Sequence, residues 1–319
     1  MQLGSRVMWR KATALAIGAL TLLVTSQASA FCRSTTCRTT GTKECQTDTD
    51  GCPAEGAKLF WPTSCISYAT NELGTQDLDP VDTRAIIKKT FQAWTDVPCA
   101  GGKGVASMAF QEREPISCKR SEYNKEGPNV NVVLFQDDDW KYRGIDGTLA
   151  KTSVTYNDET GEIYDADIEI NTANNTVTIS DDPKKIQYDL QAILTHEVGH
   201  FIGIAHSPNS DAVMFASYSP GSISQRKLTP DDVAAVCAIY PPKSGVACNV
   251  EPRGGFSASC DPPAETSTCA VAAPHTPRST GSSPSSNVSL AFMGLGILTA
   301  ARVARRRTRE QGDALRRSR

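Results

Sequence analysis

Residues 196–206 read H-E-V-G-H-F-I-G-I-A-H, and this spacing predicts a helix that ends in a turn. His196 and His200 are four residues apart, so on a helix they lie on one face and both imidazoles can reach one metal ion. Gly203 favours the left-handed backbone that turns a chain at the end of a helix. That turn can bring His206 back to the same ion.

Three imidazole nitrogens leave a fourth coordination position open for water, as a catalytic zinc site requires. Glu197 adjoins His196 on the helix, so its carboxylate can reach that water and act as a general base. The chain holds only four histidines, and three of them are in this stretch, which argues against incidental histidines on a helix. Three alternatives stay open: a zinc site kept for structure alone, a non-catalytic zinc-binding surface or adhesion module, and a non-proteolytic hydrolase that uses the same zinc-bound water.

The stretch resembles the metzincin superfamily, and within it the matrixins. Ser207, directly after the third histidine, is similar to the matrixin form of the motif. Ala212-Val213-Met214 resembles the family's Met-turn, and residues 228–240 resemble its closing helix. The resemblance implies a zinc metalloendopeptidase that acts on protein or peptide substrates with one catalytic Zn²⁺. It also implies that Met214 forms an apolar floor beneath the metal. The resemblance covers roughly residues 60–241.

The resemblance implies an α+β fold of metzincin type. Its twisted, mixed five-stranded sheet would carry an antiparallel edge strand and about three helices. The expected edge strand is Thr148–Val154, which an extended peptide substrate would join as an added strand. The sequence patterns alone predict strands at residues 66–69, 130–134 and 164–170. They also predict two helices, one capped by Asp79 and one capped by Thr229. In the strand over 164–170, apolar residues alternate with Asp165, Asp167 and Glu169, which predicts a half-buried strand.

Four aspartates are candidate calcium ligands: Asp137, Asp139, Asp165 and Asp167. They fall where folds similar to the matrixins often bind calcium, and the alternative is a solvated turn and a solvated strand face. The net charge of the chain is −2, and much of its positive charge lies at the two ends, so the body between them is acidic. An acidic body suits calcium and argues against nucleic acid as a partner.

The two ends of the chain differ from globular sequence. Residues 1–30 combine a basic start, an apolar run and Ala28-Ser29-Ala30, which predicts a secretory signal peptide; an uncleaved anchor is the alternative. Residues 243–287 are rich in Pro, Ser and Thr and predict a linker. An apolar segment over 288–301 and an Arg-rich tail over 302–319 resemble bacterial C-terminal sorting tails, with a plain membrane anchor as the alternative. We therefore expect an exported protein with transient or permanent membrane contact.

All eleven cysteines follow Ala30, and in an exported chain they predict disulfides. Residues 31–57 form a cysteine-rich segment that needs local bridges, ahead of a catalytic domain expected over 58–242 and monomeric. We find no cysteine switch of the family's usual form. A thiolate of Cys32 or Cys37 could cap the zinc, although disulfide pairing is the alternative that we favour. Outside the motif the chain has only His275, so a second zinc site built from histidines is not expected.

Overall fold

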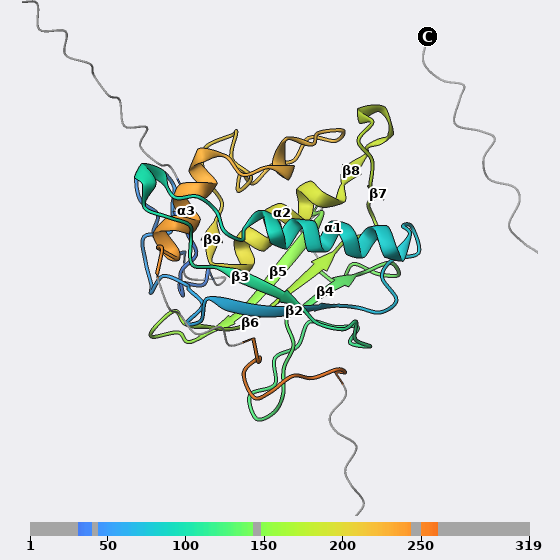
Figure 1. Ribbon diagram of the computed structural model, residues 1–319, viewed down its shortest axis with the longest axis horizontal. Coiled ribbons are helices and arrows are strands. Elements are labelled where there is room, and N and C mark those ends of the chain that lie inside the picture. The colour runs from blue at the N-terminus through green and yellow to red at the C-terminus, as the bar shows by residue number, and fades with distance from the viewer. Residues whose placement is uncertain (1–30, 40–43, 143–147, 244–249, 261–319) are drawn as a thin grey trace, which may run out of the picture. The chain divides into compact units, whose positions relative to one another are not determined.

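A mixed five-stranded sheet forms the centre of the computed structural model, which describes residues 31–39, 44–142, 148–243 and 250–260 (Figure 1). In sheet order the strands are β3 (Ala109–Glu112), β2 (Cys65–Thr70), β4 (Val132–Phe135), β6 (Ile163–Ile170) and β5 (Ala150–Tyr156). The first four strands are parallel, and β5 pairs antiparallel with β6 at the edge. The predicted sheet with an antiparallel edge strand is therefore confirmed.

Three α-helices accompany the sheet in the described residues: α1 (Pro80–Ala93), α2 (Leu190–Phe201) and α3 (Pro230–Ile239). Asp79 caps α1 by accepting hydrogen bonds from two backbone N–H groups, and Thr229 forms a capping box with Asp232 at the start of α3. Both predicted helix starts are thus confirmed. Short 3₁₀ turns occur at Ala100–Gly102 (η1), Pro183–Lys185 (η2) and Ser224–Arg226 (η3).

The main core lies between the sheet and the helices α1 and α2, which pack against each other (Figure 1). Ile87 and Phe91 of α1 are buried there with Leu194 of α2 and Ile168 of β6. At the end of α1, Trp94 is fully buried and its indole N–H donates to the carbonyl of Thr195 at 3.0 Å. This contact fixes the end of α1 against the middle of α2.

The second face of the sheet is also covered. Side chains alternate along a strand, so Val132 and Leu134 of β4 point away from the main core and join a second apolar cluster. Phe256 and Cys260 pack against that cluster. Residues 250–260, which the sequence places in a linker, therefore lie on the sheet.

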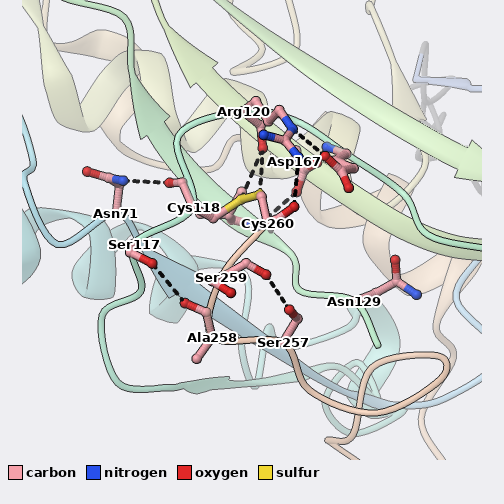
Figure 2. The surroundings of a disulfide bond; sticks show 12 residues. Asn71, Ser117, Cys118, Arg120, Asn129, Asp167, Ser257, Ala258, Ser259 and Cys260 are labelled. Carbon is pink, nitrogen blue, oxygen red and sulfur yellow. Dashed lines mark hydrogen bonds and ion pairs between the residues drawn. A yellow bond between two sulfur atoms is a disulfide. The ribbon is translucent and has the colours of Figure 1, made fainter. Parts of the chain in front are cut away.

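A disulfide joins this C-terminal segment to the body of the domain. Cys260 pairs with Cys118, and Figure 2 shows the surrounding contacts. The guanidinium of Arg120 donates to the carbonyl of Cys260 at 2.7 Å. The amide of Asn71 donates to the carbonyl of Cys118 at 2.5 Å. Both chain segments are thus held on the second face by covalent and polar contacts.

This cover changes the environment of the acidic side chains of β6. Asp165, Asp167 and Glu169 are 2%, 1% and 0% exposed. The prediction of a half-buried strand is therefore wrong, and so is the alternative of a solvated strand face for Asp165 and Asp167. Alternation identifies the two faces of a strand, but it does not show what packs on each face.

Two small sheets complete the fold. β1 (Cys32–Arg33) pairs antiparallel with β9 (Ile204–Ala205), and β7 (Val177–Thr178) pairs parallel with β8 (Tyr188–Asp189). Further disulfides join Cys32 to Cys52, Cys37 to Cys45 and Cys99 to Cys237, and Cys65 is also disulfide-bonded. Because Cys32 and Cys37 are both paired, the thiolate cap is wrong and the disulfide alternative is confirmed.

The predicted signal peptide over 1–30, the apolar segment over 288–301 and the tail over 302–319 lie outside the described residues. The described residues all fall within one compact unit, Met1–Glu265. Within the part of the chain that the structure describes, no helix has the length and apolar character needed to cross a bilayer.

Candidate metal centre

Helix α2 carries two of the three predicted zinc ligands, His196 and His200, and its start is fixed by an ion pair. The carboxylate of Asp189 caps the helix by accepting from the backbone N–H of Ala192 at 2.8 Å. The guanidinium of Arg226 donates to both oxygens of that carboxylate, at 2.8 and 2.5 Å. A bidentate pair of this kind fixes the orientation of both groups. It also ties the loop before α3 to the start of α2.

The other end of α2 is held by two side chains from outside the histidine motif. The last carbonyls of a helix lack partners within it. Here the indole N–H of Trp61 donates to the carbonyl of Phe201 at 2.8 Å. The hydroxyl of Tyr240 donates to the carbonyl of Ile202 at 2.9 Å. The end of the helix is therefore defined before the chain turns.

Gly203 makes the turn that follows α2. Its φ is +90°, a conformation that side chains with a Cβ rarely adopt. A Cβ at this position would also lie 2.7 Å from the carbonyl oxygen of Leu59. Both the backbone angle and the close approach of Leu59 therefore require glycine here. The turn leads through β9 to His206.

The structure brings the three predicted ligands together. One ring nitrogen each of His196, His200 and His206 lies within 4.8 Å of the others, and Nε2 of His200 is 3.2 Å from Nε2 of His206. Nδ1 of His196 is 2.7 Å from the carbonyl of Val213, and Nδ1 of His200 is 2.8 Å from that of Ile204. A carbonyl only accepts, so each Nδ1 carries the proton and each Nε2 lone pair is free for a metal.

The environment also favours the neutral form of two of these histidines. Burial lowers the pKa of His200 well below its usual value, and the neighbouring His196 and His206 lower it further. Burial and His196 together lower the pKa of His206 to about 4. Neutral imidazole is the form that binds metal. Three converging imidazoles fit a zinc ion, and no other group of three potential ligands occurs among the described residues.

Glu197 lies beside this cluster and is only 7% exposed. Its Oε2 accepts a hydrogen bond from the hydroxyl of Thr152 on β5 at 2.6 Å. Burial raises the pKa of the Glu197 carboxyl, while His196 and the Thr152 hydrogen bonds act in the opposite direction. The contact of Thr152 with Glu197 was not predicted from the sequence. The one available signal was the alternation of the edge strand, whose even-numbered residues face the helices.

Met214 lies beneath α2 and is 1% exposed. A Cβ added to Gly199 would lie 2.1 Å from its sulfur, so the methionine packs directly against the glycine of the motif. Asp232 accepts hydrogen bonds from the backbone N–H groups of Val213 and Met214, at 3.0 and 3.2 Å. The turn before Met214 is therefore held by a carboxylate from the start of α3.

Ser207 links the third histidine to the same region. Its backbone N–H donates to the carbonyl of Met214 at 2.8 Å, and its hydroxyl donates to Asp231 at 2.7 Å. The residue that follows His206 is thus bonded to the methionine turn and to α3. These contacts restrict the position of His206, which is itself exposed.

A cleft of about 660 Å³ opens over the histidines. Residues 148–152 at the edge strand form one wall, and α2 lies along the cleft. The opposite wall comes from residues of the loop after Met214, namely Phe215, Ala216, Ser217, Tyr218, Pro220 and Gln225. The three histidines and Glu197 also line this cleft, so a ligand that enters it meets the metal-binding group and the carboxylate together.

The four candidate calcium ligands are not brought together. The carboxylate of Asp137 accepts from the hydroxyls of Thr75 and Thr172, at 2.8 and 2.5 Å, and so connects two loops. Asp139 is exposed. In the described part of the chain, no group of three or more potential ligands contains an aspartate.

Asp165 and Asp167 form a separate buried pair. Asp167 accepts hydrogen bonds from the backbone N–H groups of Val132 and Glu122, at 2.9 and 3.0 Å. Oδ1 of Asp165 has no hydrogen-bond partner. Burial raises the pKa of Asp167 to about 7, and burial together with Asp167 raises the pKa of Asp165 well above its usual value. Their charged forms are therefore unfavourable without a further partner.

Several known proteins are similar to this chain. It is 25% identical over 189 residues to Metalloendoproteinase 1-MMP of Arabidopsis thaliana. The aligned stretch covers 58% of this chain and 45% of that protein. It is 25% identical over 204 residues to neutrophil collagenase of Homo sapiens, with 63% of this chain and 37% of the collagenase covered. It is also 26% identical over 197 residues to interstitial collagenase of Bos taurus, with 61% of this chain and 36% of that collagenase covered. The chain thus spans less than half the length of these relatives.

The family model described as matrixin matches residues 60–241. This range includes all five strands of the central sheet, the three α-helices, the histidine cluster and Met214. It also amounts to more than half of the 319 residues of the chain. The protein therefore belongs to the matrixin family.

Proposed function

We propose that this protein is an exported zinc-dependent metalloendopeptidase that hydrolyses peptide bonds in protein or peptide substrates. One observation carries the proposal. Three imidazoles converge in an open cleft beside the buried carboxylate of Glu197. A purely structural zinc site would be closed by a fourth protein ligand and would have no use for a neighbouring base.

In this proposal His196, His200 and His206 hold one zinc ion through their Nε2 atoms. Bound zinc supplies Lewis-acid polarisation of the scissile carbonyl and lowers the pKa of the attacking water. Glu197 accepts the proton of that water as it attacks the carbonyl carbon, and then returns a proton to the leaving amine. Thr152 restricts the carboxylate to one orientation through its hydrogen bond to Oε2.

The edge of the sheet favours a peptide as the substrate. β5 pairs on one side with β6, and residues 148–152 line the cleft on the other. An extended peptide can bind such an edge as a further strand, which places a backbone carbonyl over the histidines. Recognition through backbone groups suits an endopeptidase, because it does not depend on a chain end.

Removing and restoring the metal tests this proposal. We expect a purified sample to cleave a fluorogenic peptide library, to lose this activity when a chelator removes the metal, and to regain it when Zn²⁺ is added. The zinc content, measured by elemental analysis, should return to about one ion per chain. A folded sample that binds one zinc ion and cleaves no peptide or unfolded protein would favour the non-catalytic module instead.

We also propose export through the signal peptide over 1–30. Four disulfides join pairs of cysteines within the described residues, and such bonds persist in oxidising compartments. The apolar segment over 288–301 and the basic tail over 302–319 would provide transient or permanent membrane contact. We propose a monomeric catalytic domain and no nucleic-acid partner, in keeping with the acidic body of the chain.

We further propose that Asp165 and Asp167 hold a calcium ion beneath the loop over 118–126. Two adjacent buried carboxylates, one with an oxygen that lacks a partner, favour a hard cation with oxygen ligands. The same pair without calcium would favour protonation. Proton and cation therefore compete for this pair.

This competition predicts a pH-dependent effect of calcium on stability. The folded pKa of Asp167, about 7, is above its unfolded value, so the folded state binds more protons between about pH 4 and 7. Without calcium, the contribution of this group to the free energy of unfolding is full at about pH 4 and is lost as the pH rises to about 7. Added calcium should restore about 1–3 kcal/mol at pH 8 and little at pH 5.

Thermal unfolding with and without calcium at the two pH values measures this effect. In Asp165→Asn the calcium effect should disappear, whereas it should persist in Asp211→Asn, which neutralises an exposed aspartate. An equal calcium response in both variants would exclude the buried pair as the site.

A further inference from the structure

The two-residue strand β9 connects directly to two of the three histidines. The carbonyl of Ile204 accepts from Nδ1 of His200 at 2.8 Å, and this contact sets the tautomer and orientation of that ring. Ala205 is followed at once by His206. The position of β9 therefore determines where both imidazoles lie, and β9 itself is only two residues long.

β1 pairs with β9 from far along the sequence. Cys32 lies opposite Ala205, and Arg33 lies opposite Ile204. The pairing continues one residue further, because the backbone N–H of Ser34 donates to the carbonyl of Gly203 at 3.0 Å. The segment between the helix end and His206 is thus bonded along its length to the cysteine-rich N-terminal segment.

A pair of two-residue strands is not stable alone, so other contacts must hold β1 in place. Cys32 is 2% exposed and is bonded to Cys52. The guanidinium of Arg33 donates to the carbonyl of Leu59 at 2.5 Å, and the N–H of Leu59 donates to the carbonyl of Ser34 at 2.8 Å. β1 is therefore fixed by one disulfide and by its bonds to Leu59, just before the matrixin match begins at residue 60.

We propose that β1, fixed by the Cys32–Cys52 disulfide, positions His200 and His206 for zinc. The inference rests on the proposed zinc site and adds a part that lies outside the matrixin match, which begins at residue 60. The N-terminal segment thereby acts as an outer support of the metal centre. Reduction of this disulfide would loosen β9 and speed the loss of zinc, which makes metal retention dependent on an oxidising environment.

A matched pair of disulfide variants tests the proposal. Cys32→Ser/Cys52→Ser removes the bridge that fixes β1, while Cys37→Ser/Cys45→Ser removes the other bridge of the same segment. The readout is the rate at which zinc passes from the purified protein to a chromophoric chelator, measured well below the unfolding temperature. Loss of an outer support of a ligand costs about 10- to 100-fold in metal affinity. We expect zinc to leave the first variant at least tenfold faster than wild type, and the second within about twofold of it.

A second pair removes one hydrogen bond and keeps every cysteine. Ser34→Pro deletes the N–H that donates to Gly203, and Ser34→Ala keeps it. Arg33 lies in a strand, which suits a residue before proline. Ser34→Pro should therefore release zinc faster than Ser34→Ala, with kcat reduced and KM nearly unchanged once zinc is saturating. This pair decides the question if the first disulfide variant does not fold.

The outcomes separate the inference from the function on which it rests. Zinc binding by wild type together with equal release rates for Ser34→Pro and Ser34→Ala would overturn the positioning role and leave the peptidase proposal intact. A folded wild type that binds no zinc would overturn the peptidase proposal itself. Faster release from Cys32→Ser/Cys52→Ser and from Ser34→Pro, with both controls unchanged, supports the inference.

Discussion

Glu197→Gln is expected to keep its zinc and to lose kcat for peptide hydrolysis by roughly 10²- to 10⁴-fold, the usual contribution of a general base. Glutamine has nearly the volume of glutamate, and its amide oxygen can still accept from the hydroxyl of Thr152. The three imidazoles are untouched. The one property removed is the ability of the carboxylate to take a proton from water.

Steady-state kinetics on a fluorogenic peptide and zinc analysis on the same sample measure both parts of this result. Glu159→Gln makes the same chemical change at an exposed position and should behave as wild type. A Glu197→Gln variant that keeps more than about a tenth of wild-type kcat would remove Glu197 from its role as general base. Loss of zinc in this variant would instead indicate a structural role.

Asp232→Ala should lower the free energy of unfolding by about 3 kcal/mol or more. This carboxylate is 1% exposed and accepts from the backbone N–H groups of Val213, Met214 and Thr229, at 3.0, 3.2 and 2.8 Å. Alanine leaves the two buried donors of Val213 and Met214 and the partly buried donor of Thr229 without an acceptor, and each buried unsatisfied donor costs about 1–3 kcal/mol. The total is a large part of the roughly 5–15 kcal/mol that stabilises a typical domain.

Denaturant unfolding of the zinc-free protein measures this change without a contribution from the metal. Asp211→Ala removes an exposed aspartate nearby and should stay within about 0.5 kcal/mol of wild type. Because the carbonyl of Val213 accepts from Nδ1 of His196, Asp232→Ala should also weaken zinc binding. A stability like that of Asp211→Ala would mean that the methionine turn does not depend on this carboxylate.

The metal ligands could be predicted from the sequence because their geometry is local. His196 and His200 lie on one helix face, and a single turn at Gly203 returns His206. The strands and helix caps could be predicted for the same reason, because alternation and capping depend on residues only a few positions apart in the sequence. Family resemblance then supplied the mixed five-stranded sheet and its antiparallel edge strand.

What the sequence did not reveal depends on contacts between distant segments. The hydrogen bond between Thr152 and Glu197 spans 45 positions, and the pairing of Cys32 with Ala205 spans many more. No local pattern encodes either contact. Burial of Asp165 and Asp167 was missed for the same reason, because residues 250–260 read as a linker in isolation and cover the sheet only in the folded chain.

The Cys118–Cys260 disulfide has a consequence for proteolysis near the C-terminal end of the domain. A cut at residues 244–249 would not separate the domain from the chain that follows, because Cys260 would remain covalently attached to Cys118. A cut beyond Cys260 would leave the domain whole, with residues 250–260 still bonded to the sheet. A cut between residues 243 and 260 therefore separates the two pieces only after the Cys118–Cys260 bond has also been reduced.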